Sequence, residues 1–402
     1  MLSIWYRSLI SALTRNPLLQ TWLLGVAPRA CHGGLKGRSV TTAVASLLPH
    51  LEQGAAALAL DYQKCFDMLH PELVVAHLRL HQWPEMLLSL LRQIWGNQNR
   101  WMELGHLSAG GAQTVSSSML QGDPLSPLGL VVVLAEATAS VSHAGHIQSV
   151  FLDDRLLVAP TIKSLLRAWR HWQSWSHQLG LVENDSKVVA FSQSGFQTYA
   201  LLKAGFDRQK ICSQIRLLGI DWVRLLSDAL GDSGSQRIAS SLQMAARLCR
   251  APLPLQTRSA LYRTRIIPKA SFGWWFDAFP EKSKNALFAL YRNIGYVQRM
   301  CARDLRNLLE GHSFCPEFQA LCAAVRELRT AVSAGLPRDG IWTRRIHKAL
   351  VQFGWYPVES LIWEHDQVGR LDLINDPKDL VLHQVRESWR RFRWPCFLGK
   401  KI

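Results

Sequence analysis

Two short apolar segments of this chain carry acidic residues where nearly all the neighbouring side chains are hydrophobic. Residues 55–62 (AAALALDY) place Asp61 near their end, and residues 149–159 (SVFLDDRLLVA) place Asp153 and Asp154 at their middle. Runs of this length and composition predict buried strands, and the second predicts a hairpin that turns at its acids. A buried ionised carboxylate costs several kcal/mol unless it is paired or bound to a metal. The fold must therefore give these acids a partner, unless the hairpin turn is simply exposed.

The segments between and after these strands predict helices. A His-Pro pair at residues 70–71 is typical of the cap and first position of a helix, which we expect to run to about Trp95. Apolar residues recur every three or four positions from 161 to 179 and stop at Gly180, which indicates an amphipathic helix. The order of strands and helices predicts an α+β fold, in which an antiparallel sheet carries helices on one face.

The second half of the chain has a different pattern. Residues 228–236 (DALGDSGSQ) are typical of a loop and predict the main boundary, and nearly every periodic segment after them is helical. Residues 231–402 hold 27 of the 46 basic residues and 15 of the 30 acidic ones, which predicts a partner that carries phosphates. Nucleic acid is the first expectation and an anionic membrane surface the second. We expect protruding basic side chains on these helices: Arg237, Arg247, Arg250, Arg258, Arg263, Arg265 and Lys269.

The sequence predicts no membrane span and a reducing compartment. The longest apolar stretch, residues 128–135, meets Glu136 and is far shorter than the roughly 20 residues that a spanning helix needs. The eight cysteines are too sparse and irregular for a disulfide framework. We therefore expect an intracellular protein, nuclear or cytoplasmic. Residues 1–51 contain basic residues and no acid, so a mitochondrial transit peptide is the alternative.

The three acids suggest a metal centre. Carboxylates on two neighbouring strand ends can hold two Mg²⁺ ions about 3.5–4 Å apart, an arrangement that stabilises both the attacking and the leaving oxygen in phosphoryl transfer. We expect Asp61 and Asp153 to bind these ions and Asp154 to complete the site. Mn²⁺ is the alternative ion.

Four segments occur in the order of the palm motifs of reverse transcriptases. They are residues 61–67 (DYQKCFD), 121–127 (QGDPLSP), 151–154 (FLDD) and 184–191 (NDSKVVAF). The chain resembles the non-long-terminal-repeat retrotransposon type of this family and its group II intron relatives. Residues 34–39 (GLKGRS) are similar to the family's segment between fingers and palm, and residues 217–220 (LLGI) resemble its primer-gripping turn.

The resemblance implies a right-hand polymerase with four parts. Residues 1–50 would be a fingers remnant, 51–230 the catalytic palm, 231–330 a helical thumb, and 331–402 a helical basic region of unknown role. The implied activity is that of an RNA-directed DNA polymerase. It transfers nucleotides from deoxynucleoside triphosphates to the 3′-hydroxyl of a primer on an RNA or DNA template.

The resemblance also assigns roles to single residues. Phe66 lies where the family places an aromatic gate that leaves no room for a 2′-hydroxyl, although an ordinary core aromatic is the alternative. Gln121 and Gly122 would contact the incoming nucleotide and the template, or form only a helix-entry loop. Lys187 would act near the triphosphate as a cation or proton donor, unless it is a solvated surface lysine.

The N-terminal part is shorter than the resemblance requires. Only 33 residues precede Gly34, so we expect most of the fingers, and the cations that close over the triphosphate, to be missing. Arg38 and Arg7 are the nearby substitutes. We therefore expect this chain alone to extend a primer poorly. A decayed or domesticated nucleic-acid-binding protein that keeps the fold without turnover is the alternative function.

Overall fold

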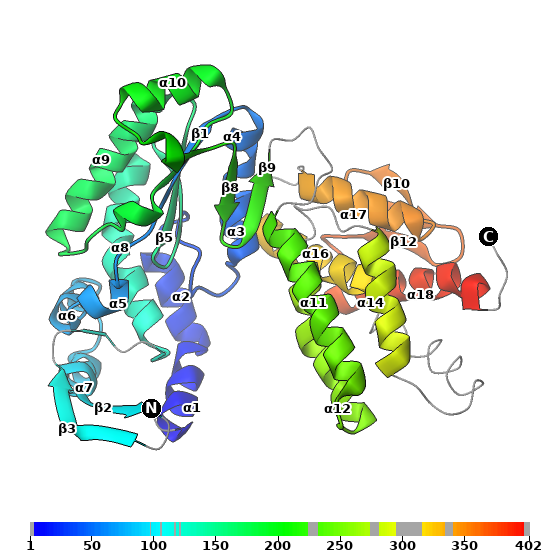
Figure 1. Ribbon diagram of the computed structural model, residues 1–402, viewed down its shortest axis with the longest axis horizontal. Coiled ribbons are helices and arrows are strands. Elements are labelled where there is room, and N and C mark those ends of the chain that lie inside the picture. The colour runs from blue at the N-terminus through cyan, green and yellow to red at the C-terminus, as the bar shows by residue number, and fades with distance from the viewer. Residues whose placement is uncertain are drawn as a thin grey trace. The chain divides into compact units, whose positions relative to one another are not determined.

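The structure is a computed structural model of the 402-residue chain. It describes residues 4–96, 98–104, 107–115, 118–119, 122–223, 232–273, 281–294, 316–333 and 341–397. The chain forms two compact units, Met1–Ile215 and Arg216–Ile402 (Figure 1). The predicted limits of the fingers, palm and thumb remain predictions.

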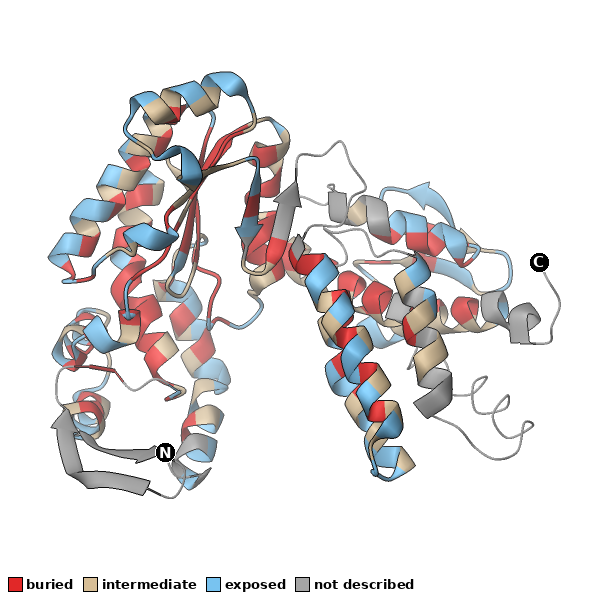
Figure 2. Cartoon of the chain, viewed as in Figure 1, coloured by how far each residue is buried: buried red, intermediate tan, exposed pale blue. Residues whose placement is uncertain are grey.

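A five-stranded sheet lies at the centre of the first unit. Its strand order is β4 (Ile147–Phe151), β5 (Asp154–Ala159), β1 (Ala56–Leu60), β6 (Val189–Phe191) and β7 (Ile211–Cys212). Every pair of neighbours is antiparallel except β6 and β7. The two predicted apolar segments thus pair directly, since β1 lies beside β5, and both strands are almost entirely buried (Figure 2).

Helices surround this sheet in the first unit. They are α1 (Ile4–Thr14), α2 (Pro17–Val26), α3 (Val40–Ala45), α4 (Leu48–Glu52), α5 (Cys65–Met68), α6 (Pro71–Leu80), α7 (Glu85–Gly96), α8 (Ser126–His143), α9 (Ile162–Gln178) and α10 (Gly195–Lys203). A separate hairpin joins β2 (Gln98–Leu104) to β3 (Leu107–Val115). Leu58, Leu157 and Trp172 share one buried core with residues of α6, α7 and α8. The α+β class with a largely antiparallel sheet is therefore confirmed.

The amphipathic helix α9 forms where the sequence predicts it. The Thr161 side chain caps its first turn by accepting from the backbone N–H of Ser164 at 3.2 Å. Leu165 and Trp172 are fully buried, and Gly180 follows the helix in the left-handed region with φ of 69°. This helix packs along β5 and β1, so it positions the strands that carry the acids.

The predicted single helix from residue 71 to about residue 95 is wrong. α6 ends at Leu80 and α7 begins at Glu85. Gln82 has a φ of 61°, which is incompatible with a continuous right-handed helix, and Pro84 has no N–H to donate to a preceding turn. The two helices then pack against each other, and α7 buries Leu88, Leu91 and Trp95.

The helix α8 is long and apolar enough to span a membrane by length and composition alone. About two thirds of it is buried inside the first unit, and Glu136 is on its exposed side. Core helices of soluble proteins pass the same test, so this helix is weak evidence for a membrane segment.

The second unit is mainly helical, as the sequence predicts. Its helices are α11 (Asp232–Arg250), α12 (Leu255–Leu261), a π-helical turn (Tyr262–Ile266), α13 (Ile267–Ser271), α14 (Glu281–Ile294), α16 (Pro316–Ser333), α17 (Ile341–Gln352) and α18 (Lys378–Phe397). Residues 232–236, which the sequence predicts as loop, are the first turn of α11.

The region 331–402, which the sequence predicts as helical, contains strands as well as helices. A three-stranded antiparallel sheet lies between α17 and α18, formed by β10 (Tyr356–Glu359), β11 (Ile362–His365) and β12 (Gly369–Asp372). Gly354 precedes the sheet with φ of 86°, and β10 contains Tyr and Val, which favour strands. These strands are short, whereas α16 and α17 repeat apolar residues at helical spacing over many positions and are therefore recognisable from sequence.

Candidate active site

The three acidic residues meet at one end of the central sheet. In the antiparallel pair of β1 and β5, Leu60 lies opposite Arg155, so Asp61 follows one strand where Asp154 begins the other. Leu152 and Asp153 form the two-residue turn between β4 and β5, and Leu152 has a φ of 58°. The predicted hairpin with acids at its turn is thus present. It brings Asp153 and Asp154 to the strand end that carries Asp61.

These carboxylates interact electrostatically. Burial, then repulsion from Asp153 and Asp61, raise the pKa of Asp154 to about 6. Burial also raises the pKa of Asp153, and Asp61 contributes to that shift. Asp61 itself is buried, whereas Asp154 is exposed to solvent. The cluster is therefore a concentrated negative charge at the surface of the unit, which favours a cation.

Lys187 supplies one such cation. It lies in a short 3₁₀ turn (Asp185–Lys187), and its Nζ donates to Oδ2 of Asp61. The backbone N–H of Asn184 donates to the carbonyl of Asp61 at 2.9 Å, which holds this turn beside β1. The Lys187 side chain is 63% exposed, and its hydrogen bond to Asp61 raises its pKa. Lys187 thus contacts one of the predicted metal ligands, and its predicted role near a triphosphate stays a prediction.

The donor chemistry suits a divalent metal, although the ligands do not already converge. Among the described residues, no three His, Cys, Asp or Glu side chains are grouped closely enough to hold an ion. Carboxylate oxygens are nevertheless the donors that Mg²⁺ and Mn²⁺ prefer, and Asp61 and Asp153 both contribute to the raised pKa of Asp154. Oδ2 of Asp61 already accepts from the Lys187 ammonium, so a metal ion at this carboxylate would share it with that ammonium or displace it.

The structure also describes two further predicted site residues, Phe66 and Gly122. Phe66 is in α5, is partly buried against the core, and accepts a 2.9 Å hydrogen bond from the N–H of Met119 at its carbonyl. Gly122 has a φ of 86°, and a side chain there would meet no atom within 4 Å. The left-handed backbone explains why this position favours glycine. Gln121 lies outside the described residues.

Sequence reasoning missed the role of Asp123, which follows Gly122. Its carboxylate is 1% exposed and accepts from Nε1 of Trp95 at 2.9 Å and from the N–H of Leu125 at 3.1 Å. It therefore anchors the QGDPLSP loop to α7. The sequence signal for this role was the presence of an acid within an apolar, proline-containing loop.

Arg38 has a different role from the predicted one. Its guanidinium donates to the backbone carbonyls of Pro28 at 2.5 Å, Cys31 at 2.6 Å and Ala27 at 3.4 Å. These bonds fix the segment after α2, because they satisfy backbone carbonyls that accept no hydrogen bond within a helix or a sheet. As the structure stands, the guanidinium serves the backbone rather than a triphosphate. The side chain of Arg7 is outside the described residues.

The sequence also gave no role to the ion pair of Arg155 and Glu183. Nη1 of Arg155 lies 3.1 Å from Oε1 of Glu183, and the two side chains are 0% and 8% exposed. Arg155 directly follows Asp154, so this buried pair adjoins the acidic cluster. The sequence signal for this buried ion pair was the presence of an arginine within the apolar run of β5.

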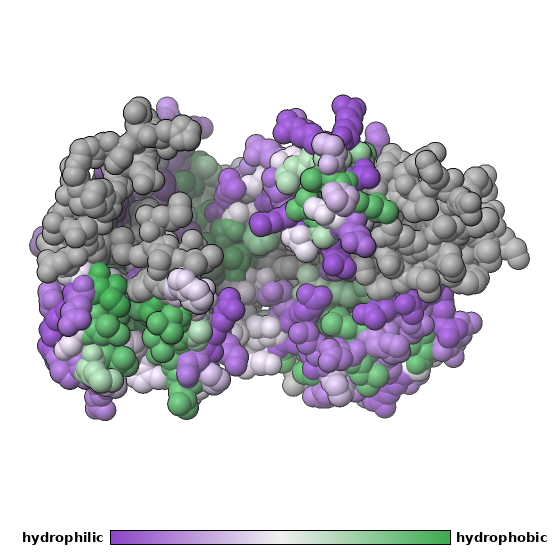
Figure 3. Space-filling view, turned by 90° about the horizontal axis from the view of Figure 1, so that it is seen from below, coloured by the Kyte–Doolittle hydropathy of each residue, from purple (hydrophilic) through white to green (hydrophobic). Residues whose placement is uncertain are grey.

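The predicted basic surface of the second unit is present in part. Arg247, Arg250, Arg263 and Arg265 are exposed. The other three predicted side chains have structural partners: Arg237 donates to the carbonyls of Gly219 and Phe272, Arg258 to that of Cys249, and Lys269 to the Ser240 hydroxyl. Figure 3 shows hydrophilic side chains over much of the described surface of this unit.

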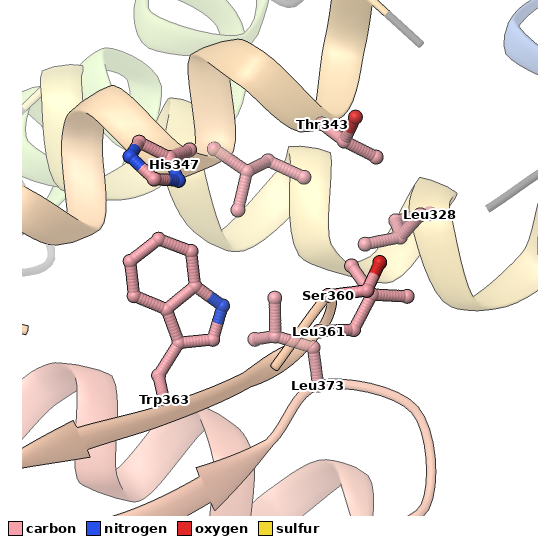
Figure 4. A pocket seen from close by; sticks show the side chains of 8 residues that line it. Leu328, Thr343, His347, Ser360, Leu361, Trp363 and Leu373 are labelled. Carbon is pink, nitrogen blue, oxygen red and sulfur yellow. The ribbon is translucent and has the colours of Figure 1, made fainter. Parts of the chain in front are cut away.

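A pocket of about 340 Å³ in the second unit is not the candidate site (Figure 4). Its lining is largely apolar, contains no acidic residue and includes none of the predicted site residues: Leu328, Thr343, Ile346, His347, Ser360, Leu361, Trp363 and Leu373. It lacks the carboxylates that phosphoryl transfer requires.

Comparison with known proteins identifies the family. Residues 6–221, more than half of the chain, match the family model described as reverse transcriptase (RNA-dependent DNA polymerase). The chain belongs to the reverse transcriptase family. The matched segment contains all three acids, Phe66 and Lys187, and reverse transcriptases generally use divalent metal ions. A search of curated proteins gave no match.

Solved telomerase structures are similar to this reverse transcriptase chain at low identity. An apo telomerase from Candida tropicalis aligns at 12% identity and a TM-score of 0.42, over 86% of this chain and 58% of that chain. A telomerase from Candida albicans in complex with a TWJ fragment of telomeric RNA aligns at 10% identity and a TM-score of 0.39, over 86% and 53%. The chain therefore spans less than two thirds of either telomerase.

Proposed function

We propose that this chain is the core of an RNA-directed DNA polymerase that joins deoxynucleotides to a primer 3′-hydroxyl. One observation carries the proposal: Asp61, Asp153 and Asp154 lie at the adjoining ends of the paired strands β1 and β5 and share one electrostatic environment inside the family-matched segment. Neighbouring carboxylates repel one another, so their grouping at a strand end favours a catalytic role over a structural one.

The residues of the site would divide the chemistry as follows. Asp61, Asp153 and Asp154 would hold two Mg²⁺ or Mn²⁺ ions, which supply charge stabilisation at the attacking and leaving oxygens when bound. Lys187 contacts Asp61 through an exposed side chain, so it can turn towards a triphosphate and neutralise charge or donate a proton to the leaving pyrophosphate. Phe66 would exclude the 2′-hydroxyl of a ribonucleotide.

The partners would be a primed RNA or DNA template and deoxynucleoside triphosphates. The exposed arginines of the second unit provide sequence-independent contacts to phosphates. The motif sequences favour the non-long-terminal-repeat retrotransposon and group II intron type within the family.

A second candidate is a nucleic-acid-binding protein that keeps the polymerase fold without turnover. It is favoured by the pairing of Lys187 with Asp61 and by the lack of a converged three-ligand group among the described residues. In such a protein the ammonium would be the permanent counterion of the carboxylates.

Primer extension tests both candidates. The full chain is incubated with a poly(rA) template, an oligo(dT) primer and dTTP, with Mg²⁺ or Mn²⁺, and single-nucleotide addition is measured. We expect Asp61→Asn and Asp153→Asn to reduce addition at least 100-fold and to retain primer-template binding. Asp185→Asn is the matched control, since Asp185 is an exposed acid in the Lys187 turn. Primer-template binding without any addition would support the second candidate.

A further inference from the structure

Three segments of the first unit contribute a residue to one buried cluster directly beside the acids. Tyr62 follows Asp61, Arg155 follows Asp154, and Glu183 precedes the turn that carries Lys187. Along a strand, successive side chains point to opposite faces. Asp154 is accordingly exposed, whereas Arg155 is buried on the face that packs against α9.

Arg155 is held from several directions. Nη1 contacts Oε1 of Glu183 at 3.1 Å and the hydroxyl of Ser176 at 3.4 Å. The guanidinium carbon lies 3.6 Å from the centre of the Tyr62 ring and 5.1 Å from that of Trp172. Among the described residues, its Nε and Nη2 have no hydrogen-bond partner, so the aromatic faces are their main compensation.

Glu183 is equally constrained. Its Oε2 accepts from Nε1 of Trp169 at 2.8 Å, and its backbone forms an isolated bridge with Tyr62. On either side of it, the N–H of Gln63 donates to the carbonyl of Val182 at 2.8 Å, and the N–H of Asn184 donates to that of Asp61 at 2.9 Å. The side-chain pair thus connects the segment 182–187 to β5, while these backbone bonds connect it to the end of β1.

We propose that Arg155 and Glu183 form a positioning pair, which sets the distance between the carboxylate-bearing strand ends and the Lys187 turn. This inference rests on the proposed function for its consequence, namely metal binding by Asp61, Asp153 and Asp154. A buried ion pair is weak as a source of stability, because the cost of desolvating both charges offsets their attraction. The position of this pair between all three functional segments gives it a role in geometry instead.

A double variant separates positioning from stability. Arg155→Met with Glu183→Gln removes both charges, and the glutamine still offers an acceptor to Trp169. Neutral replacements of buried ion pairs often leave stability unchanged or higher, so we expect unfolding by urea to change little. We expect hydrogen exchange of the Gln63 and Asn184 amides to accelerate about tenfold, and Mn²⁺ affinity, measured by electron paramagnetic resonance of the free ion, to fall about tenfold.

Single variants and a control complete the test. Arg155→Gln and Glu183→Gln each leave one buried charge unpaired. Both single variants should show faster amide exchange and weaker Mn²⁺ binding, and both should unfold at lower urea concentration than the parent chain. If either fails to fold, the double variant decides. Gln193→Leu removes the side-chain donor to the carbonyls of Leu51 and Ala55, at 2.7 and 2.9 Å, at the end of β1 opposite Asp61. It should lower stability without altering the Gln63 and Asn184 amides or Mn²⁺ affinity.

The outcomes separate this inference from the proposed function. Unchanged exchange at Gln63 and Asn184 in the double variant overturns the positioning role, whatever the metal result. If the unsubstituted chain binds no Mn²⁺, the metal-dependent function fails, and amide exchange still decides whether the pair positions these segments. Faster exchange with unchanged Mn²⁺ affinity would also overturn the proposal, because the pair would then not serve the site.

Discussion

The ammonium of Lys187 pairs with the carboxylate of Asp61 across 126 positions of sequence. The Asp61 side chain is 12% exposed and the Lys187 side chain 63% exposed, so the lysine covers the acid from the solvent side. The site therefore contains its own cation, which would compete with a divalent ion for Asp61.

Replacing Lys187 should separate metal binding from catalysis. In Lys187→Gln the competing ammonium is gone, so we expect Mn²⁺ to bind several-fold more tightly at low ionic strength. Nucleotide addition should nevertheless fall at least tenfold, because the leaving pyrophosphate loses its cation and proton donor. Lys203→Gln in α10 is the control. Equal Mn²⁺ affinity in both variants would contradict competition at Asp61.

The raised pKa of Asp154 predicts a pH dependence of stability. The folded chain binds this proton more tightly than the unfolded chain, since the pKa rises from 3.8 to about 6 on folding. The resulting stabilisation is complete below about pH 4 and is lost as the pH rises through 6. Without metal, Asp154→Asn should therefore gain stability relative to the parent chain between pH 4 and pH 7, by about 1 kcal/mol after screening at this exposed side chain.

Urea unfolding at several pH values measures that difference. Asp185→Asn serves as the comparison, because it removes an exposed acid that the structure places in the neighbouring turn. A stability difference between Asp154→Asn and the parent chain that stays constant from pH 4 to pH 7 would show that Asp154 is not strained by its charged neighbours.

The buried Asp123 should matter for folding rather than for chemistry. Asp123→Ala leaves Nε1 of Trp95 and the N–H of Leu125 without this acceptor, and we expect a loss of about 2–4 kcal/mol in the free energy of unfolding. Asp123→Asn keeps an acceptor oxygen and should cost about half as much. Asp67→Ala, at an exposed acid in α5, should change stability by less than about 0.5 kcal/mol. Equal stability of all three variants would refute the anchoring role.

Phe66 should control the choice of sugar. In Phe66→Val the smaller side chain opens space for a 2′-hydroxyl, so ribonucleotide addition should rise at least tenfold relative to deoxynucleotide addition. Phe206→Val is the matched control, since Phe206 also packs partly buried against the core but stacks on Trp169. A similar change of sugar preference in both variants would leave Phe66 as a packing residue.

Local sequence patterns were sufficient for the elements that carry the acids. The apolar runs around Asp61 and Asp153 predict β1 and the β4–β5 hairpin because burial of a strand depends on its own side chains. The three- and four-residue spacing before Gly180 predicts α9 for the same reason. The segment around Gln82 and Pro84 is harder, because the backbone reverses there without interrupting the apolar pattern on either side.

The partners of charged side chains required the tertiary structure. Arg38 and Lys187 both look like free cations in the sequence, yet one donates to three backbone carbonyls and the other to Asp61. Arg155 meets Glu183 only because β5, α9 and the 182–187 segment pack together. The sequence alone determined the apolar strands of the site and the acids at their ends, since periodicity and composition encode the burial of a strand. The pairing of each charged side chain with its partner was decided by packing between segments that are distant in the sequence, because electrostatic partners are set by distance in space.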